Sequence, residues 1–231
     1  MPTRIEVAAD PVRDRCVLTT DHISPRRLPA PVGVVRIALV AVGALLLAGD
    51  HVRIEVAISG PVRVEIIEAA GTVAYAMRGA SAQWDVDITL TGGASLHWYG
   101  EPFVVSADAA VTRSTAVRME PGCTAELRES LVLGRHGEVG GALHTVTRAW
   151  VGDDLVLAED LDLSPETRTG WAIVGSARCL DTVTALGFRL PEAAQTMQLE
   201  GSGSIARRLV QEQHESDLGS TGAHTGSGHR L

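Results

Sequence analysis

Apolar and charged residues alternate along much of the chain. The run Arg4–Val7 (RIEV) recurs as Arg53–Val56, and Arg63–Ile66 (RVEI) is a third version of it. Alternation with a period of two places one face of a strand in the core and the other in water, as in a half-buried antiparallel strand. The pattern therefore predicts a protein built mainly of β-strands.

Further strand-like segments follow at intervals of roughly 8–12 residues. Glycine, proline and aspartate separate them, for example at Ser59-Gly60-Pro61, Gly92-Gly93 and Gly152–Asp154. This spacing indicates short strands in stacked sheets and argues against βαβ units. For Asp181–Leu186 a strand and a short helix are both open. The predicted strands are Asp85–Leu90, Ser95–Trp98, Val104–Ser106, Val111–Met119, Glu126–Leu133, Leu143–Val151 and Asp154–Leu163.

The end of the chain has a different pattern. Ser204 can cap a helix that starts at Ile205, with Ile205 and Leu209 on its apolar side. Such a helix could cover its own sheet or dock on a partner. From Gly219 onward no apolar run occurs, and the polar composition predicts a flexible tail. We expect three parts: a β-rich domain over residues 1–203, an amphipathic helix over 204–218 and a Gly/Ser/His tail over 219–231.

Composition narrows the class of protein. The chain has 231 residues, of which 45% are hydrophobic, and a net charge of −8. These values favour a globular protein and argue against a nucleic-acid binder that neutralises phosphates. It contains no lysine, which excludes Schiff-base and P-loop chemistry. The apolar run Ile37–Gly49 falls short of the ~20 residues of a membrane span and indicates buried strand, and Met1–Asp10 lacks the apolar region of a signal peptide.

Cysteine and short motifs point away from a resident cofactor. Cys16, Cys123 and Cys179 are an odd number without a Cys-x-x-Cys pair, as expected for buried thiols in the reducing cytoplasm. Gly201–Ala206 matches a dinucleotide-binding pattern, but the remaining chain is too short for the βαβ unit that this motif requires. His136–Glu138 resembles the deaminase H-x-E, yet the partner P-C-x-x-C is missing.

One carboxylate occupies a position that should face the core. Glu129 alternates with Leu127 and Leu131, so it is expected to point the same way as these leucines. A buried carboxylate needs a cationic partner or a polar channel. Arg135 could fork two hydrogen bonds to Glu129 or to Glu138. Two interpretations stay open, namely a buried ion pair that fixes a turn and a carboxylate path for a metal ion.

Four segments occur in an order and spacing that bring a family into view. They are Leu47–Asp50, Ser95–Pro102, Ala107–Val111 and Glu129–Glu138. Together they resemble the urease accessory protein UreD family, also called UreH, and the match runs from about residue 32 to residue 163. The most specific piece is Leu-Gly-Arg-His-Gly-Glu, which ends at Glu138. His97 is a departure, because many members carry Glu there.

The resemblance implies a fold and a role that the alternation alone does not specify. The implied fold is all-β, a β-helix-like stack of mixed and antiparallel sheets with one or two short helices. The implied role is that of a chaperone without enzymatic activity in metallocentre assembly. Similar proteins bridge apo-urease and UreF, and through UreF the GTPase UreG, and an internal tunnel is the proposed nickel route. No tightly bound cofactor is expected, only transient Ni²⁺.

The resemblance and the apolar neighbours of these carboxylates together suggest a nickel path. Ni²⁺ accepts carboxylate and imidazole ligands, and a conduit should bind it weakly at several places. Arg135 is expected to hold the geometry of the path. Its expected ligands are Asp50, Glu101, Glu129, Glu138 and His97.

Partner contacts are expected on aromatic and late apolar residues: Trp98, Tyr99, Ile205 and Leu209. Two other functions stay open. One is a structural or interaction β protein unrelated to urease, and the other is a β-fold hydrolase whose site is not recognised in the sequence.

Overall fold

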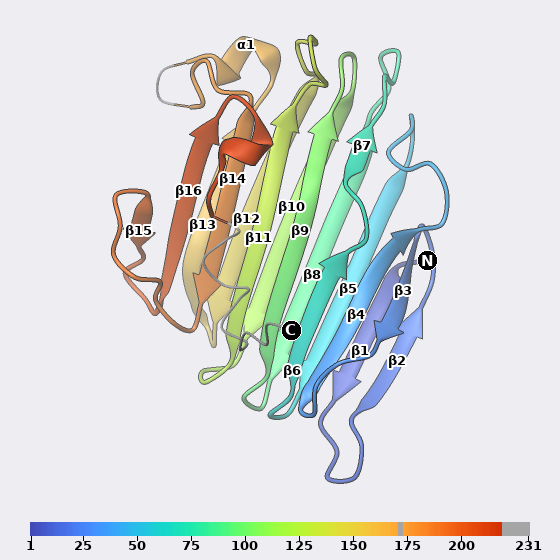
Figure 1. Ribbon diagram of the computed structural model, residues 1–231, viewed down its shortest axis with the longest axis vertical. Coiled ribbons are helices and arrows are strands. Elements are labelled where there is room, and N and C mark those ends of the chain that lie inside the picture. The colour runs from blue at the N-terminus through green and yellow to red at the C-terminus, as the bar shows by residue number, and fades with distance from the viewer. Residues whose placement is uncertain (171–172, 219–231) are drawn as a thin grey trace, which may run out of the picture.

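The computed structural model describes residues 1–170 and 173–218, which form two stacked β-sheets (Figure 1). The first sheet contains, in spatial order, β13 (Asp154–Asp162), β12 (Ala142–Val151), β10 (Ala110–Met119), β8 (Ala82–Thr91), β5 (His51–Ser59), β1 (Thr3–Ala8) and β2 (Arg15–Thr19). The second contains β15 (Thr196–Gln198), β16 (Gly203–Val210), β14 (Cys179–Leu186), β11 (Thr124–Leu133), β9 (Ser95–Val105), β6 (Arg63–Glu68), β4 (Val34–Ala41) and β3 (Ile23–Leu28). The short β7 (Thr72–Ala74) also pairs with β9, beyond the end of β6.

The central strands of both sheets run parallel. From β4 to β12 the chain passes back and forth between the sheets, so neighbours such as β5 and β8, or β9 and β11, enter in the same direction. The two RIEV repeats also pair in parallel, with Arg4 opposite Glu55. The expected antiparallel pairing is therefore wrong for these strands, although the all-β stack of mixed sheets is confirmed. Alternation reports which face is buried and carries no information on strand direction.

Tight turns between the layers explain how parallel strands form without crossover helices. Gly60 has φ +81° and Gly92 has φ +65°, conformations that residues with a Cβ rarely adopt. The Gly60 N–H donates to the Thr91 carbonyl at 3.0 Å. A Cβ on Gly92 would lie 3.0 Å from the Gly60 nitrogen, so successive turns stack closely. The predicted turn positions are thus confirmed.

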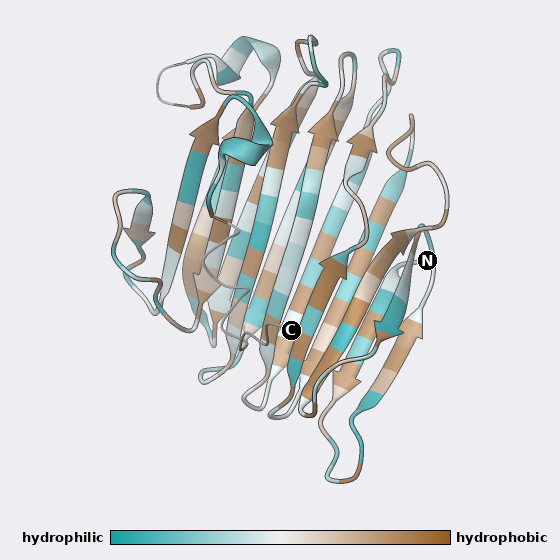
Figure 2. Cartoon of the chain, in the orientation of Figure 1, coloured by the Kyte–Doolittle hydropathy of each residue, from teal (hydrophilic) through white to brown (hydrophobic). Residues whose placement is uncertain are grey.

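The core lies between the sheets and is formed by the inward face of each alternating strand. Figure 2 shows hydrophobic and hydrophilic bands alternating along the strands. Ile5, Ile54 and Leu96 have no exposed surface. Trp84 and Phe103 meet edge to face at 5.6 Å between ring centroids and join the two layers. The predicted strands 95–98 and 104–106 are parts of the single strand β9.

The segment expected to be an amphipathic helix is a strand. β16 lies between β14 and β15 and pairs with both in antiparallel ladders. Ile205 and Leu209 are four residues apart, a spacing that places them on one face of a helix and also on one face of a strand. The two antiparallel ladders make this segment a strand. The segment from Ser204 is therefore part of the second sheet and is not a separate element. The expected tail over 219–231 lies outside the described residues.

Helix is scarce in the described residues. They contain the α-helix α1 (Pro165–Arg168) and the 3₁₀ turn η1 (Gln213–Glu215). Neither has the length or apolar character to cross a membrane. The open choice at Asp181–Leu186 is settled as strand, because these residues belong to β14. Cys123 and Cys179 are buried, Cys16 is half-buried and all three are free thiols.

Candidate functional site

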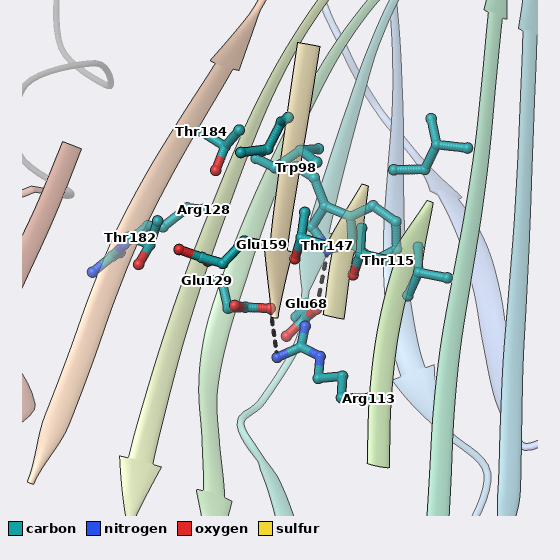
Figure 3. Close-up of a pocket in the computed structure, with 14 residues that line it drawn as sticks. Glu68, Trp98, Arg113, Thr115, Arg128, Glu129, Thr147, Glu159, Thr182 and Thr184 are labelled. Atoms are coloured by element: carbon teal, nitrogen blue, oxygen red, sulfur yellow. Dashed lines mark hydrogen bonds and ion pairs between the residues drawn. The ribbon is translucent and has the colours of Figure 1, made fainter. Parts of the chain in front are cut away.

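A polar cavity lies between the two sheets, where a hydrophobic core would be expected (Figure 3). Its volume is about 60 Å³, room for a few water molecules. Threonine, glutamate and arginine side chains project into it from both layers. The polar lining residues are Glu68, Arg113, Thr115, Arg128, Glu129, Thr147, Glu159, Thr182 and Thr184. A buried set of this kind is costly unless each charge finds a partner.

A β-bulge in β9 shapes one wall of this cavity. Gly100 and Glu101 together face the single residue Glu129 of β11, because the register shifts at this point. A side chain at Gly100 would collide with the Arg128 carbonyl oxygen, so only glycine fits. Bulges redirect side chains and often occur next to functional sites. Here the bulge coincides with the end of β6 at Glu68 and the start of β7 at Thr72.

Glu68 is the last residue of β6, and its carboxyl group hydrogen-bonds to the neighbouring strand β9 at the bulge. Its Oε1 accepts a hydrogen bond from Trp98 Nε1 at 3.0 Å, and its Oε2 accepts one from the Glu101 N–H at 3.0 Å. Burial raises the pKa of the Glu68 carboxyl, and this outweighs the opposing hydrogen bonds and the charge of Arg113. The cavity thus contains a carboxyl group that two hydrogen bonds hold in place and whose pKa is raised.

Two arginines neutralise the other carboxylates of the cavity. Arg113 Nη1 lies 2.8 Å from Glu129 Oε1, and its guanidinium stacks over the Phe103 ring at 4.8 Å. Arg207 donates to both oxygens of Glu159 at 2.8 Å and 2.8 Å. The second pair connects β16 with β13 and so bridges the two sheets at one edge. The lining residue Arg128 pairs in turn with the buried Asp181 at 3.3 Å, so each arginine of this region has a carboxylate partner.

A second, larger pocket, called the outer pocket below, shares Glu68 with the first, which is called the inner cavity. Its volume is about 300 Å³. It lies at the break after β6 and is lined by the end of β4, the following loop, the segment between β6 and β7, Tyr75 and Trp84. Arg113 of the inner cavity lies 6.0 Å from the centroid of the Trp84 ring, which lines the outer pocket. Among the described residues, Glu68 is the one that lines both of these pockets.

Of the predicted path residues, only Glu129 lines the inner cavity. It points the same way as Leu127, as its alternation indicates, and Leu127 lines the same cavity. Its cation is Arg113 of β10 and not Arg135. Arg113 occupies an inward position between Val111 and Thr115, a charge in an alternating core pattern, which is the signal that could have revealed it.

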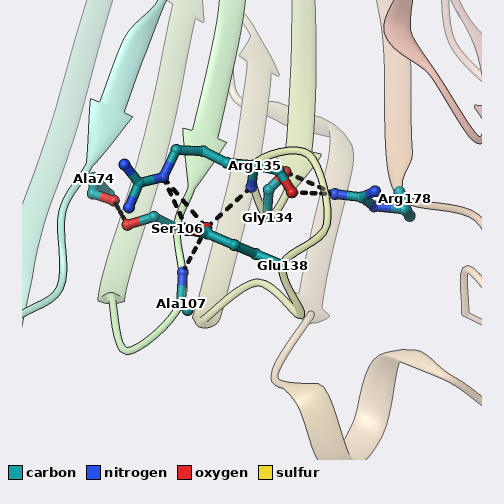
Figure 4. Close-up of polar contacts among 7 residues, drawn as sticks. All are labelled: Ala74, Ser106, Ala107, Gly134, Arg135, Glu138 and Arg178. Carbon is teal, nitrogen blue, oxygen red and sulfur yellow. Dashed lines mark hydrogen bonds and ion pairs between the residues drawn. The ribbon is translucent and has the colours of Figure 1, made fainter.

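Glu138 and Arg135 form a local network in the loop after β11 (Figure 4). Glu138 Oε2 accepts from the N–H groups of Ala107 and Arg135, both at 3.2 Å, and the Arg135 side chain lies 3.1 Å from Glu138 Oε1. The Ala107 N–H holds the pKa of Glu138 below its ordinary value. This carboxylate fixes a loop, as the ion-pair interpretation expects, and does not line the cavity.

The remaining predicted ligands also lie away from the inner cavity. Asp50 Oδ2 accepts the Leu47 N–H at 2.9 Å and closes a turn. Glu101 is exposed and contributes its backbone N–H to Glu68. His97 lies on the outer face of the second sheet, 3.8 Å from Glu126. No three His, Cys, Asp or Glu side chains of the described residues form a ready metal-binding group.

The predicted partner contacts divide between surface and interior. Tyr99 stacks beside His97 on the outer face, with ring centroids 6.4 Å apart. Leu209 is 45% exposed. Trp98 and Ile205 are buried in the sandwich and cannot contact a partner unless the fold opens. The inference from their apolar character is wrong for these two residues because that character serves the core.

The sequence does not single out four charged residues of the cavity: Glu68, Arg113, Arg128 and Glu159. Glu68 follows two consecutive isoleucines, and Glu159 lies among several acidic residues of β13, so neither stands out from a solvated strand. Only the sandwich geometry brings them together.

Comparison with known proteins identifies the family. A profile described as UreD urease accessory protein matches residues 12–226. Urease accessory protein UreD 1 of Streptomyces griseus is 40% identical over 190 residues, covering 81% of this chain and 74% of the relative. Urease accessory protein UreD of Frankia alni is 32% identical over 184 residues, covering 79% of this chain and 59% of the relative. This chain thus spans between half and three quarters of its relatives' length. The chain belongs to the UreD urease accessory protein family, as the four sequence segments indicate.

Proposed function

We propose that this protein is a non-enzymatic scaffold in urease maturation that passes Ni²⁺ through its interior. It acts in the cytoplasm, bound to apo-urease on one side and to UreF, and through UreF to UreG, on the other. The observation that carries the proposal is the polar cavity inside an otherwise apolar sandwich. An interior that only had to be stable would be filled with hydrophobic side chains.

The side chains of the cavity can bind a divalent cation such as Ni²⁺ weakly and release it again. Carboxylates from both sheets face it, which are ligands that Ni²⁺ accepts. They do not form a closed ligand set among the described residues, so an ion would be held weakly and released. Glu68, shared by the inner cavity and the outer pocket, supplies the step between them.

An apolar rim beside the outer pocket supports docking of a partner there. Four large apolar side chains near the outer pocket are 40–62% exposed. Exposed apolar side chains that form a group mark an interaction surface, whereas single ones are normal on any protein. We propose that UreF covers this rim, so that nickel enters from the complex and not from bulk water. The rim residues are Val40, Val42, Leu47 and Tyr75.

A hydrolase is the weaker alternative. A histidine, an aspartate and a serine do meet on the outer face of the first sheet. Asp85 contacts His51 Nε2 at 2.6 Å and accepts from the Ser114 hydroxyl at 2.7 Å. The hydroxyl thus donates to the carboxylate and not to the imidazole, so it lacks the general base that a nucleophile needs.

Activation of urease in cells tests the conduit. The structural subunits of urease are co-expressed with the accessory proteins and with wild-type, Glu129→Gln or Glu68→Gln chains. Glu126→Gln is the matched control, because Glu126 lies on the same strand as Glu129 but on the outer face. We expect the two cavity variants to lower urease activity and nickel content by roughly tenfold, the scale of loss at other tuned metal sites. Pull-down of UreF verifies that the complex still forms.

Each outcome bears on the proposal. Loss of activation with the complex intact and the Glu126→Gln control active would support the conduit. Normal nickel content with both cavity variants would refute it. A chain that fails to capture UreF after Val42→Glu and Leu47→Glu substitutions, while it stays folded, would support the rim as the docking surface.

A further inference from the structure

Arginine side chains occupy positions that a cation in the cavity would need. Glu129 is bound by Arg113 of β10, and Glu159 is bound by Arg207 of β16. Both arginines come from the sheet opposite to their carboxylate. A passage for a dication would be expected to avoid fixed positive charge, because like charges in a poorly solvated interior repel strongly.

We propose that Arg113 and Arg207 are resident counter-cations that hold the cavity carboxylates until a divalent metal ion exchanges with the guanidinium groups. The inference rests on the proposed function and adds its regulation. The free chain then keeps its acidic interior neutral, and binds metal weakly because each ligand is already occupied. Release of an arginine, and not assembly of new ligands, creates the metal-binding state.

Arg113 is the looser of the two. It contacts one oxygen of Glu129, and its guanidinium lies over the Phe103 and Trp84 rings. Its Nε is buried and has no acceptor within the described residues. The cavity gives this guanidinium space to move. The buried donor without an acceptor is energetically costly, which favours a change of partner.

Glu68 provides a second acceptor for a released Arg113. The charge of Arg113 already acts on the Glu68 carboxyl. Arg207, in contrast, donates to both oxygens of Glu159 and also to Thr182 Oγ1 at 3.2 Å. We therefore expect exchange to begin at Arg113 and Glu129, with Arg207 and Glu159 the firmer pair.

Nickel binding by the full chain tests the exchange directly. Equilibrium dialysis with Ni²⁺ alone compares wild type, Arg113→Gln and Arg113→Lys. The matched control is Arg118→Gln, which removes the same charge from the outer face of the same strand, where Arg118 stacks on Trp150 at 4.6 Å. We expect Arg113→Gln to bind Ni²⁺ roughly tenfold more tightly or better, because one buried positive charge is removed. Arg113→Lys and Arg118→Gln should bind like wild type.

A double variant locates the effect. The gain of Arg113→Gln should disappear in Arg113→Gln/Glu129→Gln if Glu129 is the ligand set free. If Arg113→Gln does not fold, as judged by circular dichroism, Arg207→Gln and Arg207→Gln/Glu159→Gln make the same comparison at the other pair. Equal binding by wild type and a folded Arg113→Gln chain overturns the proposal. A gain that persists in the double variant also overturns it.

The test is separate from that of the conduit. Nickel binding by the isolated chain reports on the arginines, whereas urease activation reports on transport. If Glu129→Gln and Glu68→Gln both activate urease normally while Arg113→Gln still binds nickel more tightly, the exchange stands and the conduit fails. If Glu129→Gln blocks activation while Arg113→Gln binds like wild type, the conduit stands and the exchange fails.

Discussion

The pair of Arg207 and Glu159 should contribute measurably to stability, because it connects β13, the edge strand of the first sheet, with β16, which lies next to the edge of the second. Both side chains are only about one-fifth exposed, and the guanidinium contacts both carboxylate oxygens at 2.8 Å. Loss of one partner costs roughly 0–1 kcal/mol for an exposed pair and roughly 3–5 kcal/mol for a buried one. The intermediate burial here leads us to expect about 2 kcal/mol for Arg207→Ala.

This loss can be measured by unfolding. For a domain of this length, about 2 kcal/mol lowers the midpoint of thermal unfolding by roughly 4–8 °C. Urea titrations of wild type, Arg207→Ala, Glu159→Ala and the double variant complete a double-mutant cycle, in which we expect a coupling of about 1–2 kcal/mol. Arg208→Ala is the control, because Arg208 on the same strand pairs with Asp217, which is 62% exposed. It should change stability little.

Two results would refute the reasoning. If Arg207→Ala and Arg208→Ala shift the urea midpoint equally, the edge pair has no special weight. If the single losses simply add in the double variant, the two side chains do not stabilise each other, whatever each contributes alone.

Two further predictions concern the bulge and its carboxyl group. Burial raises the native pKa of Glu68 above its ordinary 4.5, so the unfolded chain releases this proton at lower pH than the folded chain does. The free energy of unfolding therefore falls as the pH rises from about 4.5 towards the native pKa, by up to about 1.4 kcal/mol per pH unit. As the pH rises above about 4.5, urea midpoints should decline more steeply for wild type than for Glu68→Gln; parallel curves would contradict this. Gly100→Ala should destabilise the chain by about 2 kcal/mol or more, because the new Cβ would collide with the Arg128 carbonyl oxygen. Gly43→Ala is the control and should be neutral in the same titration, because the space around Gly43 is open. Equal midpoints for the two variants would show that the bulge can relax.

The sequence predicts a contact, or the direction of a side chain, where the residues that decide it lie within a few positions of each other. The alternation of His51–Ser59 predicts a strand with one buried face, and β5 has that pattern. The sequence offers Glu129 and Glu138 as partners of Arg135, and the structure pairs Arg135 with Glu138, three residues away. The inward direction of Glu129 followed from Leu127 and Leu131 alone. In each case the determining contact is local or depends only on periodicity.

Assignments that depend on a partner from another layer were not accessible in the same way. The helix expected from Ile205 is a strand because β14 and β15 pair with it. The cation for Glu129 comes from the opposite sheet, and Trp98 faces the core and not a partner. None of these outcomes follows from spacing along the chain.

The sequence by itself determined that this is a β-strand protein, which family it resembles and that Glu129 faces inward, because period-two alternation and short motifs are properties of neighbouring residues. Only the tertiary structure decided that the central strands run parallel, and that Glu68, Arg113 and Glu159 meet Glu129 around one polar cavity. The physical reason is that strand direction and contacts between sheets are set by how distant segments stack, and identical local patterns are compatible with many such arrangements.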